Sequence, residues 1–295
     1  MSLRRAYIEL HIAVILLAFT AILGDLISLS ASVLVWWRTL IAAGGMALFL
    51  GITRRWRSDW VRKQKKIYYL GALIAIHWLC FFGCIKLANA STALITFATI
   101  SFFTAWIEPW ITGRKRERHE MIFGLIVIPG ILLIAGKAEG QILVGVILGI
   151  LAAFLVAIIA SLEKKWITET DPEHMTFIQL TGAWVTMCIW LGGEWLYQGI
   201  DSFMPTGYDL LYLLILGLIC TCIAWVLSTR AIRTVTAFDQ MMVINLEPVY
   251  GIIMALTLLN DRHELNPSFY IGAAIILASV LIHPFWQYRY ARTRT

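Results

Sequence analysis

Long apolar runs separated by short polar segments dominate the sequence. Each run has about 17 residues or more, which is the length that an α-helix needs to cross the hydrocarbon core of a bilayer. The predicted spans are Tyr7–Gly24, Ala31–Ile52, Ile67–Leu87, Thr92–Thr112, Glu120–Gly136, Gln141–Leu162, His174–Tyr197, Asp209–Thr229, Thr236–Asn260 and Pro267–Trp286. The pattern therefore predicts an all-α integral membrane protein with ten transmembrane helices.

Composition supports a membrane protein. Hydrophobic residues make up 60% of the 295-residue chain and charged residues only 14%, whereas soluble domains carry about 25% charged residues. In water a chain of this composition would expose large apolar patches and aggregate. In a bilayer the same surface faces lipid, so the lipid bilayer is a predicted partner.

The distribution of lysine and arginine predicts the orientation. Placing the N-terminus inside assigns 20 of the 24 basic residues to cytoplasmic segments, and such residues stay on the cytoplasmic side. We therefore expect an even number of spans, both termini in the cytoplasm, and a location in the inner (plasma) membrane. The net charge of +6 does not indicate nucleic-acid binding, because the basic residues lie in short clusters between apolar runs.

Two halves of the chain resemble each other. At an offset of 144 residues, Thr92-Ala93 falls on Thr236-Ala237, and at an offset of 148 the helix from Gly124 falls on the helix from Gly272. We therefore predict two repeats of five helices, residues 1–137 and 138–295. Since five is odd, the halves have opposite orientations, and such an inverted repeat is a recurrent plan of secondary transporters.

The ninth predicted span carries the most specific motif. Residues 245–251 read NLEPVYG and residues 258–265 read LLNDRHEL, ahead of the Gly272 helix. This order resembles the closing pattern of the EamA domain, in the drug/metabolite transporter (DMT) superfamily. A looser copy, Trp106 to Pro109 before Gly113, occurs in the first half, and the Trp37-Arg38 pair also resembles the family.

The resemblance covers the whole chain as two EamA repeats and implies a fold and a function. The implied fold has ten helices around a central cavity lined mainly by spans 1, 3, 4, 6, 8 and 9. The implied function is the movement of amino acids or similar small metabolites, usually outward and in some members inward. Two departures are visible: Asn260-Asp261 stands where the family usually has Gly-Glu, and Glu108-Pro109 is not placed as the partner of Glu247-Pro248.

Ionisable residues inside predicted spans are functional candidates, because charge in a bilayer is costly. Glu247 lies deepest, and Pro248 beside it loosens the helix, so a binding site, a gate or a proton site is weighed against a structural kink. Arg38 is expected to pair with an acid and fix helix packing, or to act in gating. Asp239 and Glu108 lie near helix ends, where we expect them to be solvated.

Aromatic and polar residues in mid-span complete the candidate substrate site. The lone His77 shares a helix face with Phe81 at the four-residue spacing, and such a face offers a stacking surface to a ring or an organic cation; packing within the bundle is the alternative for each aromatic residue and for the histidine. The candidates for substrate binding are Phe19, His77, Trp78, Phe81, Thr96, Thr99, Trp225, Asn245 and Glu247.

Several function classes are disfavoured by missing motifs. The chain has no GxxxxGK loop for ATP and no HExxH or GxSxG motif, so we do not expect an enzyme. The five cysteines form no CxxC pair, and we expect no metal site and no cofactor. The favoured function is a secondary exporter of a small metabolite, with a proton as the candidate coupling ion; an uptake carrier of the same fold and a non-catalytic membrane subunit stay open.

Small residues are expected to let the helices approach one another closely, as in other membrane proteins. The glycines predicted for this role are Gly44, Gly45, Gly145, Gly149 and Gly182.

Overall fold

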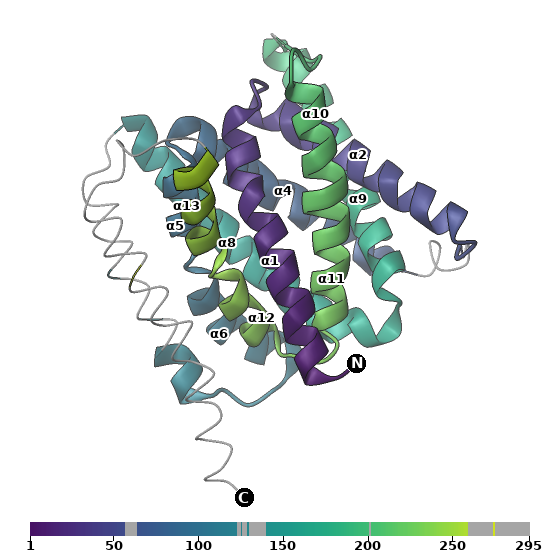
Figure 1. Ribbon diagram of the computed structural model, residues 1–295, viewed down its shortest axis with the longest axis vertical. Helices are drawn as coiled ribbons and strands as arrows, with labels where there is room; N and C mark the ends of the chain where they lie inside the picture. Colours follow the sequence, from purple (N-terminus) through teal and green to yellow (C-terminus); the bar gives the residue numbers. More distant parts are fainter. Residues whose placement is uncertain are drawn as a thin grey trace, which may run out of the picture.

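The computed structural model describes residues 1–56, 64–122, 140–200 and 202–258, together with the single positions 125, 129 and 274. This part of the chain is helical and contains no strand (Figure 1). The helices are α1 (Leu3–Leu26), α2 (Ala31–Ile52), α4 (Lys65–Leu87), α5 (Ala90–Phe97), α6 (Ile100–Thr112), α8 (Gly140–Trp166), η1 (Ile167–Glu169), α9 (Pro172–Gln198), α10 (Asp209–Leu214), η2 (Ile215–Ile223), α11 (Ala224–Ala231), α12 (Ala237–Ile244) and α13 (Glu247–Leu258).

Seven segments of the described part are long and apolar enough to cross a membrane. They correspond to predicted spans one to four and six to eight, and the observed helix Ala31–Ile52 has the predicted bounds. The ninth predicted span is present as two consecutive shorter helices, α12 and α13. Most of the fifth predicted span and all but one residue of the tenth lie outside the described residues, so the expected total of ten stays a prediction.

Two of the predicted spans are interrupted near their middle. The fourth is divided into α5 and α6 at Ala98 and Thr99, and the ninth into α12 and α13 at Asn245 and Leu246. At both points backbone N–H groups bond to carbonyls three residues back, at Ala98, Thr99 and Leu246, which is the tighter pattern of a 3₁₀ turn. Broken membrane-spanning helices are typical of the binding regions of secondary transporters.

Polar residues begin the helices where the sequence links are short. The side chains of Ser30 and Asn89 accept hydrogen bonds from the backbone N–H groups of Val33 and Thr92, respectively. Thr236 and Asp239 form a reciprocal capping box at the start of α12. Such caps satisfy N–H groups that have no partner within the helix, so tight links between spans are possible.

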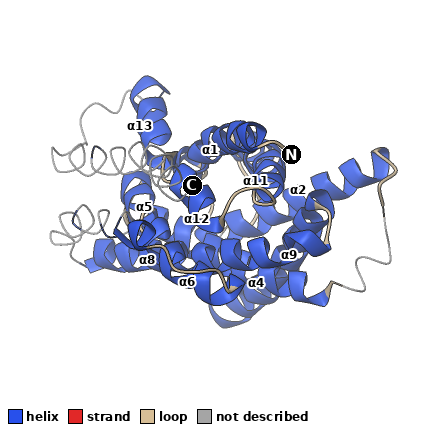
Figure 2. Ribbon diagram, turned by 90° about the horizontal axis from the view of Figure 1, so that it is seen from below, coloured by secondary structure: helices blue, strands red, loops and turns tan. Residues whose placement is uncertain are grey.

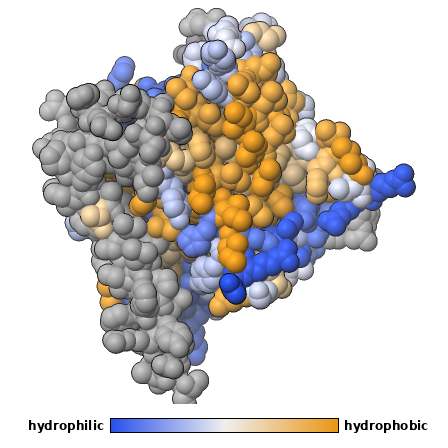
Figure 3. Space-filling view, viewed as in Figure 1, coloured by the Kyte–Doolittle hydropathy of each residue, from blue (hydrophilic) through white to orange (hydrophobic). Residues whose placement is uncertain are grey.

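Helix α4 lies inside the bundle, against α8 and α9, while α1 packs against α11 and α13. Seen from below, α1 and α11 lie on one side of the bundle and α8, α6, α4 and α9 on the other, with α12 between them (Figure 2). The outer surface over α1 and over α10 to α11 is apolar, with hydrophilic residues gathered toward the N-terminal end of α1 (Figure 3). An apolar band bordered by charge fits a helix bundle surrounded by lipid.

Glycines allow α4 and α9 to cross in close contact. A Cβ atom added to Gly71 would meet the carbonyl oxygen of Gln179 and lie 2.7 Å from the nitrogen of Ala183, while one added to Gly182 would lie 2.8 Å from the Tyr68 oxygen. Gly45, Gly145 and Gly149 also face neighbouring helices closely. The expectation for Gly44 was wrong, since nothing lies within 4 Å of a Cβ placed there.

The Gly71→Ala substitution should lower the free energy of unfolding by about 1–3 kcal/mol, the usual penalty of overpacking. The clashing atoms belong to backbone, which cannot rotate away as a side chain does. Thermal unfolding of the purified protein in detergent measures the change. Gly44→Ala is the control, and it should keep or slightly raise the unfolding midpoint, because its Cβ meets nothing within 4 Å and alanine favours the helix. Equal midpoints for the two variants would contradict the close crossing.

Candidate functional site

A cavity of about 60 Å³ lies between the two halves of the chain. Its wall includes residues from α1, α2, α4, α5, α8, α11, α12 and α13, so spans from both predicted repeats contribute. The lining residues are Leu17, Thr20, Arg38, His77, Trp78, Phe81, Phe97, Val156, Ile159, Ala160, Glu163, Trp225, Ser228, Gln240, Met241, Ile244 and Glu247.

Arg38 of α2 is buried at the wall of this cavity. Its guanidinium carbon lies 4.0 Å from the centre of the Trp78 ring, which places the cation on the aromatic face. Its Nε donates a hydrogen bond to Oγ1 of Thr221 at 2.9 Å, while its Nη1 has no hydrogen-bond partner. One terminal donor of this buried arginine is therefore unpaired.

The π-helical stretch η2 determines the position of this arginine. Thr221 donates through Oγ1 to the carbonyl of Leu216, five residues earlier, at 2.6 Å, and accepts from Arg38 with the same oxygen. Gly217 lies against Ile41 and the Arg38 carbonyl, where a Cβ atom would lie 3.4 Å from that oxygen. Single π-helical segments occur often at functional sites, and here the segment presents an acceptor to the guanidinium.

A second polar chain reaches the cavity from α9. Trp225 Nε1 donates to Oε1 of Gln179 at 3.0 Å, and Gln179 Nε2 donates to Oε1 of Glu163 at 2.8 Å. The ring centres of Trp225 and Trp78 are 5.4 Å apart, nearly perpendicular to each other. Glu163 is thus a buried carboxyl group held in one orientation, with one oxygen bonded to the protein.

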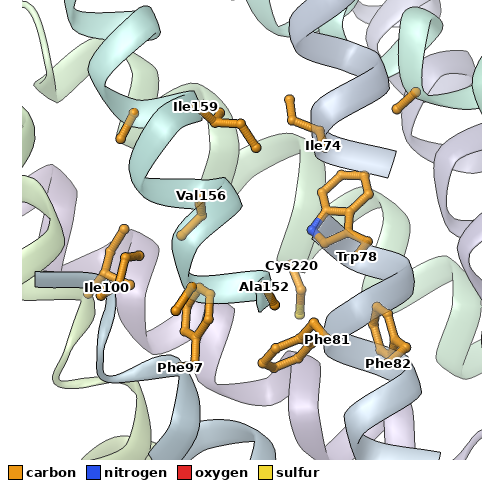
Figure 4. Packing of buried hydrophobic residues seen from close by; sticks show 14 of the residues in the cluster. Ile74, Trp78, Phe81, Phe82, Phe97, Ile100, Ala152, Val156, Ile159 and Cys220 are labelled. Atoms are coloured by element: carbon orange, nitrogen blue, oxygen red, sulfur yellow. The ribbon is translucent and has the colours of Figure 1, made fainter. Parts of the chain in front are cut away.

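Aromatic rings form one end of the cavity. His77 Nδ1 is 2.9 Å from the carbonyl oxygen of Ala152, so the ring nitrogen is the donor. Its ring centre is 5.5 Å from that of Phe97, and Phe97 is 5.4 Å from Phe81. Figure 4 shows Phe97 pointing toward Val156 and lying across from Phe81. This wall is suited to apolar parts of a ligand.

Two further polar side chains of the wall carry an unpartnered oxygen. Gln240 donates through Nε2 to Oγ of Ser228 at 2.6 Å, and its Oε1 accepts nothing. The hydroxyl of Thr20 also has no partner. Both residues are buried.

Glu247 begins α13, the second half of the broken ninth span, and lines the cavity with Arg38. Among the described residues no ion pair joins them within 4.0 Å, and Pro248 follows Glu247 in the first turn of the helix. A carboxyl group therefore lies at a helix break and shares the cavity wall with the cation Arg38.

The structure brings together only part of the predicted site. His77, Trp78, Phe81, Trp225, Glu247 and Arg38 line the cavity, whereas Phe19, Thr96, Thr99, Asn245 and Pro248 are not among its lining residues. Thr96 and Thr99 donate their hydroxyl hydrogens to carbonyls of their own span. Asn245 Nδ2 donates to Oγ of Ser101 at 2.9 Å, so it connects the two interrupted spans.

The expectation that Glu108 and Asp239 are solvated was wrong. Glu108 is 1% exposed and accepts hydrogen bonds from the backbone N–H groups of Ala237 and Phe238, both at 2.9 Å, and from Arg114. Asp239 belongs to the capping box at the same helix start. Free N–H groups at the start of a helix attract a carboxylate. A carboxylate near the end of one helix is therefore as compatible with burial against the start of another helix as with exposure to water.

Polar contacts join α1 and the link that follows it to neighbouring helices near both of its ends. At the end where α1 stops, Ser28 donates to both carboxylate oxygens of Asp209. At the opposite end, which we predict to be cytoplasmic, Arg230 bonds to Glu173 at 2.7 Å and lies 3.9 Å from Glu9. These contacts join α1 to α10 at one end and to α9 and α11 at the other.

Sequence reasoning missed most residues of the wall, among them the polar residues Glu163, Gln240 and Thr20. Glu163 lies just beyond the predicted end of the sixth span, before Lys164 and Lys165, and was taken with the polar link; α8 continues to Trp166 and buries it. Gln240 and Thr20 are uncharged, so they did not stand out among ionisable candidates. A search for polar amides within apolar runs would have found Gln240.

Within the residues that the structure describes, no group of three histidine, cysteine, aspartate or glutamate side chains is placed to hold a metal ion. The cavity combines a cation, two carboxyl groups, an amide and aromatic rings. Such a set offers hydrogen-bonding groups and stacking surfaces of the kind found in small-molecule sites.

Comparison with known proteins gives a consistent result. The chain matches the EamA-like transporter family over residues 4–136 and again over residues 143–283. No curated protein matches it in sequence. A solved structure titled only "Crystal structure of protein" is similar over 95% of this chain and 96% of its own, with a TM-score of 0.75 and 13% sequence identity, which shows a shared fold.

Proposed function

This chain belongs to the EamA-like transporter family, and we propose that it is a secondary carrier that exports an amino acid or a similar small metabolite across the inner membrane by alternating access. The family places it among multi-pass membrane transporters of the DMT type, built from two EamA repeats. Our proposal adds the substrate, the direction, the division into repeats at residues 137 and 138, and the mechanism.

The observation that supports this proposal best is the polar cavity between the two halves. It is bounded by two broken spans, and it contains buried charge that a purely structural bundle would not retain without a partner. Polar contacts join α1 to its neighbours at both ends, and their loss at one end while the other end holds would open the cavity to one side. Alternating access requires that arrangement.

Coupling to a proton is part of the proposal. The titratable side chains that face the cavity are Arg38, His77, Glu163 and Glu247. A carboxyl group that takes up a proton on one side of the membrane and releases it on the other couples the two fluxes. An uptake carrier of the same fold and a non-catalytic membrane subunit are the alternatives.

Counterflow in proteoliposomes tests the proposed function. We expect saturable exchange of at least one labelled solute from a panel of amino acids and related metabolites. Glu247→Gln and Trp78→Ala should each weaken that exchange about tenfold, which corresponds to the loss of about 1.4 kcal/mol of substrate interaction.

The matched controls are Trp195→Ala and Glu169→Gln, because both side chains lie on the surface, away from the cavity. They should leave the exchange unchanged. Folded wild-type protein that exchanges no solute of the panel would contradict a carrier and favour the subunit alternative.

A further inference from the structure

A second pocket lies at the end of the bundle that we predict to be cytoplasmic, apart from the central cavity. It forms where the end of α2, the turn η1, the start of α9 and the link between α11 and α12 meet, and its volume is about 770 Å³. Three arginines, Arg54, Arg55 and Arg233, line it together with Trp56, His174 and two carboxylates. The pocket is therefore basic, and it shares no residue with the central cavity.

The two carboxylates of this basic pocket are already paired within the protein. Glu169 forms an ion pair with Lys66. Asp171 lies 3.4 Å from Nδ1 of His174 and 3.9 Å from Nη2 of Arg233. The acids thus draw on Lys66, His174 and Arg233, and leave the other arginines of the pocket to a further partner.

Arg54 and Arg55 are the two arginines that remain. Arg55 Nη1 is 4.0 Å from Glu173, but Arg230 binds the same carboxylate oxygen at 2.7 Å. Among the described residues no ion pair includes Arg54, and both arginines are exposed to solvent. Two neighbouring guanidinium groups without a close acid suit the oxygens of a phosphate group, which they can bind with paired hydrogen bonds.

The backbone at Arg54 indicates that its side chain has a use. Within the described part of the chain it is the only non-glycine residue with a positive φ, 53°. The N–H groups of Arg54 and Arg55 bond to the carbonyls of Gly51 and Leu50, which is the closing motif of a helix that usually has glycine at this place. A side chain there costs free energy, so a benefit from arginine has to come from what its guanidinium binds.

Apolar residues of the same helix continue from the basic pocket toward the lipid. Leu48, Phe49 and Ile52 are 64%, 43% and 73% exposed. Trp56 is half exposed and packs on Phe177, with ring centres 5.2 Å apart, and tryptophan is enriched at the border between lipid and water. Figure 3 shows hydrophilic residues beside apolar ones at this end of α2. A free anion would use only the basic part of this surface, whereas a lipid would use both parts.

We propose that the basic pocket binds the phosphate head group of an anionic phospholipid of the cytoplasmic leaflet. The phosphate lies at Arg54 and Arg55, and the acyl chains follow Leu48 to Ile52. Basic pockets between helices at the cytoplasmic side are a recurrent form of such recognition. The lipid would connect α2, α9 and the link that leads into α12, so it should stabilise the bundle. The inference goes beyond the carrier function, and its test needs no transport.

The test compares two lipids with identical acyl chains, phosphatidylglycerol and phosphatidylcholine, added to the purified protein in a neutral detergent. Phosphatidylglycerol should raise the unfolding midpoint and stay bound in native mass spectrometry, and phosphatidylcholine should do neither. Raising the salt from about 50 mM to about 500 mM should weaken the effect, because salt screens exposed charges.

The variant Arg54→Asn separates the lipid site from the fold. It should weaken phosphatidylglycerol binding at least about tenfold, as expected for the loss of one charge-assisted contact. Without lipid its unfolding midpoint should equal or exceed that of the wild type, because asparagine adopts a positive φ more readily. The matched control is Arg118→Asn, which removes an exposed charge that does not line the pocket and should leave lipid binding unchanged.

Three results would overturn the proposal. Equal stabilisation by the two lipids would show that no anionic head group is recognised. Equal loss of phosphatidylglycerol binding in Arg54→Asn and Arg118→Asn would show that the overall charge attracts the lipid. Glycerol 1-phosphate has the same phosphate without chains, and if it stabilises the protein as well as phosphatidylglycerol at equal concentration, the pocket binds a soluble anion instead of a lipid.

Discussion

Glu108→Gln lowers the apparent unfolding midpoint of the detergent-purified protein by about 10 °C. Glu108 reaches from α6 to the start of α12 and accepts two backbone hydrogen bonds there, while it also pairs with Arg114. Glutamine keeps one acceptor, but its amide N–H₂ meets a backbone N–H group. The loss of one partner of a buried charge pair destabilises by about 3–5 kcal/mol, and each kcal/mol shifts the midpoint by about 2–4 °C.

Glu169→Gln is the matched control, because Glu169 is half exposed and pairs with Lys66 at the surface. Exposed pairs contribute about 0–1 kcal/mol, so its midpoint should stay within about 2 °C of the wild type. Similar midpoints for the two variants would show that the contact between α6 and α12 adds nothing to stability.

Glu163→Gln abolishes accumulation driven by a proton gradient but leaves counterflow within about threefold of the wild type, a change of about 0.6 kcal/mol. Glutamine has the shape of a protonated glutamate and still bonds to Gln179, so the cavity keeps its form. It exchanges no proton, so the substrate moves without one. Uptake of labelled substrate with and without a pH gradient, in parallel with internal pH recorded by a trapped dye, measures the coupling.

Glu247→Gln is the comparison, since it alters the carboxyl group opposite Arg38 and is expected to weaken counterflow itself. Proton-driven accumulation that persists in Glu163→Gln and disappears in Glu247→Gln would assign the proton site to Glu247. Persistence in both variants would contradict coupling through either carboxyl group.

The length and apolarity of the runs were enough to predict the seven spans that the described residues contain. Ala31–Ile52 begins after a capping serine and ends where the polar segment Thr53 to Arg55 begins, and both signals are local. The interruption of the fourth span was not predictable in the same way. Neither Ala98 nor Thr99 breaks a helix by itself, yet the N–H groups of both bond to carbonyls three residues back.

Only those features of the site that depend on the spacing of residues within one helix could be predicted from the sequence. The spacing of His77 and Phe81 indicates a shared face, and the two rings do face the same cavity. The partner of Arg38 was not predictable, because Trp78 and Thr221 come from two other helices. Glu163 was missed because it stands beside two lysines. A charged cluster of this kind occurs both in a polar link and in a last helical turn, and the sequence does not distinguish the two.

The contact of Glu108 with α12 also constrains how the protein is made. The N–H groups that Glu108 binds belong to Ala237 and Phe238, 129 and 130 residues later in the chain. At about 5–20 residues per second, a ribosome needs on the order of ten seconds to produce that stretch. During this time the Glu108 carboxylate lacks its native partners in α12. Arg38 likewise lacks its hydrogen-bond partner until Thr221 has been made. The early helices therefore lack these contacts, and bind water or other temporary partners, until the later helices have been made.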